Sequence, residues 1–558
     1  MYSAPYATQE NSYNPSSANL EQKWSNYTLT TGILQADNVR SFEKHNLSAM
    51  INYTSQKRHT NSTMAKAYGY PTIYNPQIDA GAVPEKMAGT EGQWGSSSFV
   101  GRVTYDYDSK YLLQLSANYN GSLCYHPDKR WGFFPAVSAG WRISEEQFMK
   151  DLVPQMDNLK LRASWGSIGN DSQLNASQFV SGWQFEDRFI LGGAGNSSAS
   201  ITNGMKEANL ANPNITWYKV MTTNVGLDGS FWGGKLSFEF DYFYRKTTGY
   251  PATRNTSLPT TSGIPLPQEN LNSSDNRGFE LSLGTVQRIG NVNLQIKGNV
   301  AYAREKDLYK EQALPLNQYK NWRDNGAYRW KNVTWGYEHI GQFQSYDEIY
   351  NSPIQDGKGN SSLRPGDIKY KDLNGDGLID ANDEKVIGKG TFPDLNFGLT
   401  LAADWKGFDV NILFQGASNY TQVLNALTSP FRGPGEGNGF RVWMDSWHKA
   451  DYNDPDSEWV PGKFPSLRIE GNDNNSKKST YWTTDAYYVR LKSIEIGYTI
   501  PKNLLSKVGI EHLRVYANAY NPLTITNVKY TDPEAIEGWQ SFYYPQLKVY
   551  SFGVNVSF

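Results

Sequence analysis

The chain has 558 residues and a formal net charge of −2, from 53 Lys and Arg against 55 Asp and Glu, so it lacks the basic excess with which proteins neutralise nucleic-acid phosphates. Only 38% of the residues are hydrophobic, and no stretch approaches the roughly 18 to 20 continuous apolar residues of a membrane-spanning helix. The single cysteine, Cys124, excludes an intrachain disulfide framework. A soluble β protein and a membrane β-barrel both remain open, because a barrel strand needs only one apolar residue in two.

The amino terminus has neither the basic start nor the apolar stretch of a signal peptide, as Met1–Pro5 shows. A membrane barrel has to cross the inner membrane, so we expect this sequence to be the later part of a longer gene product. A cytoplasmic soluble protein is the alternative explanation.

Apolar and polar residues alternate along many segments, which is the period expected of β-strands. The clearest segments in chain order are 113–120, 236–244, 292–297 and 395–401. Near the carboxy terminus the apolar positions change phase, from Val489 and Leu491 to Ile494 and Ile496, which predicts a β-bulge at Lys492-Ser493. Helical signals are sparse, and residues 144–149 are expected to form one turn.

Short turns and long connections alternate along the chain. We expect tight turns at 232–234, 290–291 and 405–407, and long connections at 60–96, 167–215, 304–394 and 417–485. Membrane barrels have this asymmetry, with short periplasmic turns and long external loops. The sequence therefore predicts an all-β fold, an antiparallel transmembrane β-barrel with about 14 to 16 strands.

The last strand has the most regular alternation. Tyr550, Phe552, Val554, Val556 and Phe558 alternate with small or polar residues. This pattern resembles the terminal strand that outer-membrane assembly machinery recognises in bacterial barrels. Tyr and Trp also gather near strand ends, as they do in the aromatic girdles of membrane barrels.

Several local sequence motifs resemble those of the SusC/RagA family of TonB-dependent outer-membrane transporters. They are residues 130–141, 159–170, 488–498 and 550–558, which follow the family's order and span most of the chain. The resemblance implies a 22-stranded barrel in the bacterial cell outer membrane, an amino-terminal plug, and a SusD-like surface lipoprotein as a lid. It also implies import of oligosaccharides or peptides, with energy from the TonB complex reaching the plug.

Residues 1–558 are accordingly expected to be a partial TonB-dependent receptor β-barrel domain without the plug or a signal peptide. Unpaired backbone groups at the edges of an incomplete barrel would cost several kcal/mol each in lipid. We therefore expect these strands to pair with further sequence, to close as a smaller barrel, or to fail to insert.

One loop has the spacing of a calcium-binding loop. Oxygen ligands would come from Asp372, Asn374, Asp376, the carbonyl of Leu378, Asp380 and Asp383, with Gly377 at the sharp turn. The last position is Asp where such loops usually have Glu, and no helices are expected to flank it. A structural Ca²⁺ and an Asx-rich loop held by its own turns are the two interpretations, and no other cofactor is indicated.

Aromatic residues in the long connections form the candidate substrate surface, because flat rings stack on sugar faces. They are Trp322, Trp330, Trp335, Trp443, Trp447, Tyr481 and Trp482. Ordinary loop packing or contact with the lid is the alternative for each of them.

An enzymatic function is not indicated. The six His residues show no metal-ligand spacing, and neither a nucleophile elbow nor a phosphate loop is present. A transport barrel is the preferred hypothesis. A soluble glycan-binding or glycan-active β protein is the first alternative, and a surface adhesin is the second.

Overall fold

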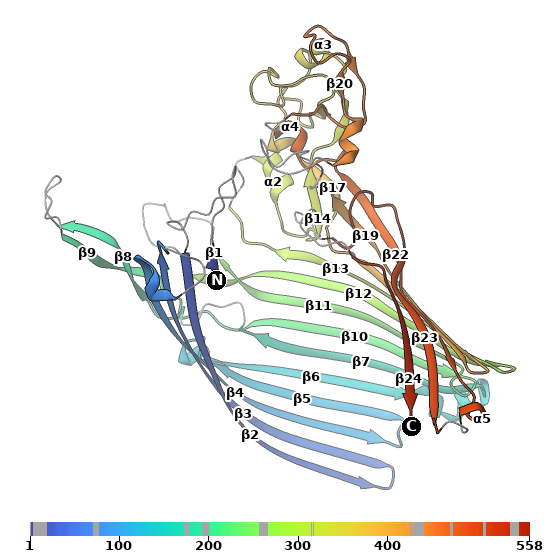
Figure 1. Ribbon diagram of the computed structural model, residues 1–558. Helices are drawn as coiled ribbons and strands as arrows, with labels where there is room; N and C mark the ends of the chain where they lie inside the picture. The colour runs from blue at the N-terminus through green and yellow to red at the C-terminus, as the bar shows by residue number, and fades with distance from the viewer. Residues whose placement is uncertain are drawn as a thin grey trace. The chain divides into compact units, whose positions relative to one another are not determined.

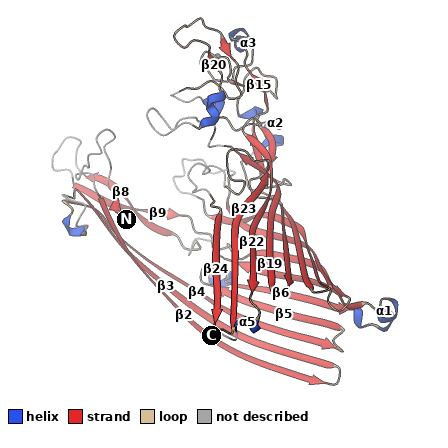
Figure 2. Cartoon of the chain, turned by 45° about the vertical axis from the view of Figure 1, so that its right-hand side comes forward, coloured by secondary structure: helices blue, strands red, loops and turns tan. Residues whose placement is uncertain are grey.

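The computed structural model describes residues 2–3, 19–70, 77–171, 178–191, 200–255, 266–313, 315, 317–424, 427, 440–468, 473–505, 509–535 and 546–558 (Figure 1). β-strands dominate these residues, and helices are short and few (Figure 2). No helix within the described ranges is both long and apolar enough to cross a membrane.

Sixteen strands form one sheet, in which every strand follows its predecessor in the chain apart from short strands inside connections. In spatial order they are β1 (Tyr2–Ser3), β2 (Asn19–Phe42), β3 (His45–Tyr68), β4 (Val83–Tyr107), β5 (Tyr111–Ser122), β6 (Trp131–Arg142), β7 (Met156–Asn170), β10 (Tyr218–Phe231), β11 (Leu236–Thr253), β12 (Gln268–Ile289), β13 (Val292–Tyr309), β18 (Leu395–Trp405), β19 (Phe408–Val423), β22 (Thr483–Thr499), β23 (His512–Thr526) and β24 (Val549–Ser557). This sheet confirms the predicted all-β fold.

Four small two-stranded sheets and five helices lie in the connections. The small sheets are β8 (Gly182–Leu191) with β9 (Ser200–Asn209), β14 (Val333–Gly336) with β17 (Lys385–Lys389), β15 (His339–Gln342) with β16 (Ile368–Tyr370), and β20 (His448–Lys449) with β21 (Trp459–Val460). The described helices are α1 (Gln147–Leu152), α2 (Gln318–Asp324), α3 (Tyr346–Tyr350), α4 (Asp473–Ser476) and α5 (Lys502–Leu505). The predicted helical turn at 144–149 corresponds to a 3-10 turn, Ile143–Glu145, and the start of α1.

The chain divides into two compact units. The first comprises Met1–Ala139, Ser164–Thr222 and Thr247–Asn272, and contains small clusters such as Tyr125, Phe134, Ile215 and Trp217. The second comprises Gly140–Ala163, Thr223–Lys246 and Ser273–Phe558, and contains the largest apolar cluster.

The predicted tight turns are confirmed. β12 and β13 are joined by Gly290 and Asn291, and Ile289 pairs with Val292. Trp405 pairs with Phe408 across Lys406 and Gly407, both of which have positive φ, at 47° and 89°. Two positive-φ residues match the twist of the flanking strands, and the Cβ of any residue replacing Gly407 would lie 2.7 Å from the Thr499 carbonyl oxygen.

The predicted bulge is also present. On one side Leu413 pairs with Ser493 and Phe414 with Leu491, and on the other Ser493 pairs with Tyr520 and Leu491 with Leu523, so Lys492 is the extra residue. The bulge changes which residues face each side, and this accounts for the phase switch in the sequence.

The expected long connection at 60–96 is wrong. β3 and β4 run through most of that range, paired from His45–Tyr107 to Tyr68–Val83 with one register shift between Lys66 and Ala67. The segment is rich in Asn, Thr, Ser and Gly, so it shows no apolar alternation. A hairpin ladder depends on backbone groups, and these strands therefore form without the side-chain pattern on which the prediction relied.

The apolar face of the sheet remains exposed. In β24, for example, Phe552 is 87% exposed, and in β12 Leu283 is 49% exposed. A β-sandwich would bury this face against a second sheet, whereas a membrane barrel presents it to lipid.

Candidate functional site

The polar face of the sheet carries partly buried ion clusters that join neighbouring strands. Arg162 of β7 donates to Asp228 of β10 (Nε–Oδ1 3.0 Å) and to both carboxylate oxygens of Asp241 in β11 (2.6 Å each). Arg514 of β23 similarly donates to Asp409 of β19 (Nε–Oδ1 3.0 Å) and to Glu495 of β22 (2.7 Å). Each arginine thus bridges two carboxylates across the ladder, and bidentate pairs of this kind fix side chains in defined positions.

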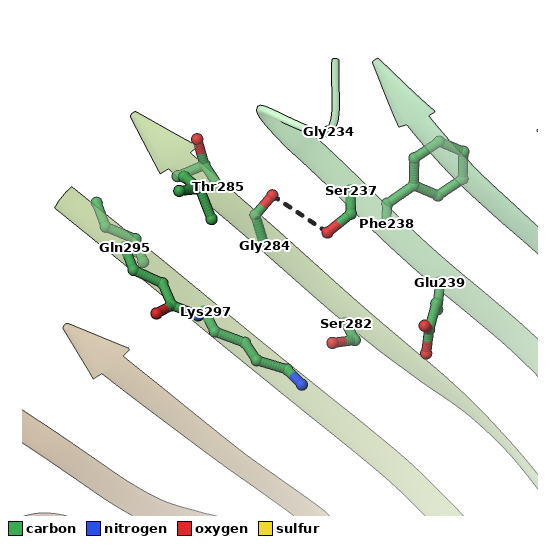
Figure 3. Close-up of a pocket in the computed structure, with 11 residues that line it drawn as sticks. Gly234, Ser237, Phe238, Glu239, Ser282, Gly284, Thr285, Gln295 and Lys297 are labelled. Atoms are coloured by element: carbon green, nitrogen blue, oxygen red, sulfur yellow. Dashed lines mark hydrogen bonds between the residues drawn. The ribbon is translucent and has the colours of Figure 1, made fainter. Parts of the chain in front are cut away.

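A hollow of about 210 Å³ lies on three strands of this sheet, near the tight turns (Figure 3). Its lining includes Ser237 and Glu239 of β11, Ser282 of β12 and Lys297 of β13. Ser237 donates to the Gly284 carbonyl (3.4 Å), and a Cβ at Gly284 would lie 2.7 Å from that hydroxyl oxygen. Hydroxyls and charges of both signs give the hollow the donors and acceptors that a polar ligand requires.

The described residues of two long connections, within 310–394 and 424–482, fold together into what we call the loop module. In Figure 1 α2, α3, α4, β14 and β20 gather beyond the ends of β13, β19 and β22, and Figure 2 shows α2, α3 and β20 in the same place. Its apolar core draws Tyr337, Ile368, Tyr370 and Ile379 from the first connection and Leu424, Leu427, Trp443, Phe464 and Trp482 from the second. The two connections therefore form one packed body.

Short α4 locks the two connections together by hydrogen bonds. Asn474 donates to the Ile368 carbonyl (3.0 Å) and accepts from Gln355 (2.9 Å). Asn475 accepts from the Ile368 amide (3.0 Å), and its carbonyl accepts from the Trp482 indole (2.7 Å). Buried amides satisfied in this way specify one arrangement of the surrounding backbone.

A buried ion pair reinforces this contact. Asp367 has no exposed surface, accepts from Asn475 (2.8 Å) and from the Arg364 amide (3.0 Å), and pairs with Arg468. Burial raises the pKa of Asp367, although the positive charge of Arg468 opposes that shift. The pair joins residues 101 positions apart.

Three of the aromatic residues predicted to contact substrate are buried in the loop module. Trp443, Trp447 and Trp482 are at most 5% exposed, and Trp443 contacts the rings of Phe464 and Trp482. Tyr481 is partly buried beside them and donates its hydroxyl hydrogen to the Lys463 carbonyl (2.5 Å). In this conformation their faces are covered by protein.

The other three predicted aromatic residues lie outside that core. Trp322 of α2 is 66% exposed and its ring is 5.8 Å from that of Tyr319. Trp335 of β14 is half-buried, with the Arg329 guanidinium 5.9 Å from its ring. Trp330 is half-buried beneath the Arg304 guanidinium, at 4.3 Å. Trp322 thus has the most open ring of the set.

The loop at 372–383 is held by its own hydrogen bonds. The Asp372 carboxylate accepts from the amides of Gly375 (2.6 Å) and Gly377 (2.9 Å). Asn374 and Asp376 accept from the amides of Asp376 and Leu378. Gly375 and Gly377 have φ of 76° and 79°, which favours glycine at both positions.

The end of that loop is a capping box. Asp383 is fully buried and accepts from the amides of Leu373 (2.8 Å) and Asp380 (2.9 Å). Asp380 accepts in turn from the Asn382 amide (2.7 Å). Across the described part of the chain, no three His, Cys, Asp or Glu side chains are arranged to hold a metal ion. Calcium binding at 372–383 therefore stays a prediction.

Sequence reasoning missed the residues that assemble the loop module, namely Gln355, Asp367, Arg468, Asn474 and Asn475. Their partners lie about 100 positions away in the chain, so no local spacing identifies them. The sole signal was a polar run, Asn472–Ser476, inside an otherwise aromatic connection.

The main antiparallel sheet has an exposed apolar face and a polar face that carries paired charges. Tight turns join its strands at one end, and the long connections form a folded body. These features together define the class of outer-membrane β-barrels. A model of the TonB dependent receptor-like β-barrel family matches residues 2–522. The chain belongs to this family, and its members are proteins of the outer membrane.

Curated relatives support the same assignment. TonB-dependent receptor P3 of Formosa agariphila is 28% identical over 95% of this chain and 53% of its own length. TonB-dependent receptor SusC of Bacteroides thetaiotaomicron is 25% identical over 83% of this chain and 43% of its own length. The chain thus spans about half the length of the curated relatives it matches.

The fold matches a solved structure at lower sequence identity. The RagAB peptide transporter aligns with a TM-score of 0.75 and 20% identity, over 100% of this chain and 58% of the solved chain. These matches confirm the resemblance to SusC and RagA. Membership of this family argues against the first alternative hypothesis, a soluble glycan-binding or glycan-active protein. The curated relatives are named as receptors, and the solved structure is named as a transporter.

Proposed function

We propose that this chain forms the barrel wall and outer loops of an active importer for large polar nutrients, either oligosaccharides or peptides. The observation that carries the proposal is the pairing of a charged, hydrogen-bonding sheet face with a folded loop module at one end of the strands. A polar lumen suits hydrated solutes, and a structured module suits recognition of a solute or a lid.

The energy source and the partner follow from the same assignment. We infer coupling to the TonB complex through a plug domain and a SusD-like surface lipoprotein as the lid. In support, one relative is named SusC and the RagAB structures are named as a peptide transporter and importer. The loop module would be the surface nearest such a lid, because long loops of membrane barrels are external.

The exposed ring of Trp322 is the sharpest candidate for a substrate contact. Removing one stacked ring loses about 0.5–1.5 kcal/mol. We therefore expect Trp322→Ala to raise the concentration for half-maximal uptake about 2- to 13-fold. Trp24→Ala is the matched control, because Trp24 is also highly exposed, at 78%, but lies in β2.

The test is uptake of fluorescently labelled oligosaccharides and peptides by cells with and without this gene. Uptake of at least one of the two classes should require both the gene and TonB. Uptake that is independent of TonB, or equal loss with Trp322→Ala and Trp24→Ala, would contradict the proposal.

We also propose that β24 is read by the outer-membrane assembly machinery. Tyr550, Phe552 and Phe558 are each at least 63% exposed, and Val554 and Val556 lie on the same face. Phe552→Ser should reduce folded protein in the outer membrane several-fold, measured by surface proteolysis, because an exposed aromatic recognition element is lost. Ser551→Ala, on the opposite face, should leave that amount unchanged, and equal effects of the two would refute the proposal.

A further inference from the structure

The apolar face of β12 and β13 ends at Phe279 and Tyr302. Three cationic residues, Arg277, Arg304 and Lys306, follow next to this face. Phe279 pairs with Tyr302, Arg277 with Arg304, and Asp275 with Lys306. No register shift interrupts the pairing from Ser274 to Ile289, so alternate residues keep the same face. Arg304 and Lys306 therefore share a face with Val300 and Tyr302.

The length of the apolar stretch places these cations at a membrane surface. On β13 the apolar face runs from Val292 to Tyr302. Ten residue steps span about 33 Å along a strand, and a tilt of roughly 40° reduces this to about 25 Å, the height of the apolar band of a membrane barrel. Arg304 is the next residue on that face. The tight turn 290–291 lies at the other end of the strand, so Arg304 lies at the external end.

Trp330 closes the group, which we call the outer-rim cluster: Arg277, Arg304, Lys306 and Trp330. Trp330 forms an antiparallel bridge with Lys306, which places its ring on the same face. The guanidinium carbons of Arg304 and Arg277 lie 4.3 Å and 5.7 Å from the ring centre, and the Lys306 Nζ lies at 6.0 Å. Tryptophan at this height is typical of the membrane–water interface.

The cluster carries more positive charge than its neighbouring carboxylates neutralise. Arg277 pairs with Asp275 (2.9 Å), and Arg304 lies 3.4 Å from Asp394. The Lys306 Nζ lies 5.7 Å and 6.0 Å from the ring centres of Tyr328 and Trp330, and it pairs with no carboxylate among the described residues. Arg277, Arg304 and Lys306 carry three positive charges, and Asp275 and Asp394 carry two negative charges. The cluster therefore has one positive charge in excess.

We propose that the outer-rim cluster binds the phosphate group of an outer-leaflet lipid. Guanidinium forks match phosphate oxygens in charge and geometry, and the adjoining Val300 and Tyr302 face would contact the acyl chains of the same lipid. A lipid is favoured over a soluble anion because the cationic and apolar surfaces are continuous on one sheet face. The proposal depends on the outer-membrane location and is independent of what the protein transports.

The test is native mass spectrometry of the detergent-purified protein titrated with dioleoylphosphatidylglycerol. Arg277→Gln, Arg304→Gln and Lys306→Gln together should weaken lipid binding at least 5-fold. The control replaces Lys235, Lys406 and Lys502 by Gln, which removes the same charge from exposed positions outside the cluster and should leave binding within 2-fold. Equal loss in both variants would reduce the effect to net charge and overturn the site.

Two further arms identify the ligand chemistry. Dioleoylphosphatidylcholine has the same chains with a zwitterionic headgroup, and it should bind at least 5-fold more weakly than phosphatidylglycerol. Inorganic phosphate at 10-fold molar excess over lipid should not displace the lipid; displacement would make this a soluble-anion site and overturn the lipid assignment. Should the triple variant not fold, Lys306→Gln alone should still weaken binding about 2- to 3-fold, and no change there would also overturn the proposal.

Discussion

Asp367 is a carboxylate that the loop module encloses completely, and its contacts lie in both long connections. Removing one partner of a buried ion pair leaves the other charge unpaired, which costs about 3–5 kcal/mol. We therefore expect Asp367→Ala to lower the free energy of opening of the loop module by about that amount. The measurement is amide hydrogen exchange in residues 343–370 and 473–482.

The matched variant separates the charge effect from loss of packing. Asp367→Leu combined with Arg468→Met removes both charges and keeps apolar volume, so it should recover most of the lost protection. If Asp367→Ala leaves exchange in both segments unchanged, Asp367 does not hold the two connections together.

His339 gives the loop module a dependence on pH. Burial lowers the pKa of His339 below its ordinary value of 6.5, and its ring lies 5.2 Å from that of Tyr481. A lowered pKa means that the unfolded chain takes up the proton more readily. The stabilisation is thus complete above pH 6.5 and is lost as the pH falls through the folded-state pKa.

We expect exchange protection of residues 337–342, corrected for intrinsic rates, to fall between pH 7.5 and pH 5. In His339→Gln the decrease over this interval should be smaller, since no imidazole titrates. Asp356 acts only at lower pH: burial opposes its ionisation, but hydrogen bonds from Ser362, Lys358 and Asn360 lower its pKa to about 2. A slope unchanged by His339→Gln would exclude His339 as the cause.

At the scale of single elements, strands were predicted from the sequence where apolar and polar side chains alternate. β13 and β18 alternate regularly because one face meets an apolar environment and the other a polar one, so they and the bulge at Lys492 were predicted. β3 and β4 extend through a polar segment that lacks apolar alternation, so their outer halves were missed. Trp443 and Trp482 were predicted to lie near substrate because a sequence does not distinguish an aromatic loop surface from an aromatic loop core.

Calcium binding by the 372–383 loop is a prediction from the sequence that the structure does not test. The side-chain oxygens of Asp372, Asn374 and Asp376, at alternate positions of the loop, accept hydrogen bonds from the loop's own amides. The same oxygen atoms are the ones that a bound Ca²⁺ would use. If Ca²⁺ binds, Asp372→Asn with Asp376→Asn should weaken calorimetrically measured affinity at least 10-fold, because two anionic ligands are lost. Asp454→Asn with Asp456→Asn is the control, since Asp454 forms a similar turn without the loop spacing. Equal affinity in all three proteins, or no heat at all, would exclude this site.

At the scale of the whole molecule, chain order and sheet order coincide. Each strand of the main sheet pairs with the strands before and after it, apart from inserted small sheets. No second layer of structure covers the apolar face in the described part of the sheet, as the exposed Leu283 and Phe552 indicate. Stability in a membrane must then come from unbroken ladders, because lipid offers no hydrogen bonds to a freed amide or carbonyl.

A proline in a central strand tests that dependence. Leu399 of β18 pairs with Gly298 on one side and Phe414 on the other. Leu399→Pro removes a ladder donor and clashes with the neighbouring backbone, at a cost of several kcal/mol in lipid. We expect wild-type protein and the control Leu399→Ala to migrate differently before and after boiling in SDS, as folded barrels do, and Leu399→Pro to lose that difference. Retention of the unboiled band by Leu399→Pro would mean that the sheet tolerates a broken ladder, and stability would then have to come from contacts such as the loop module.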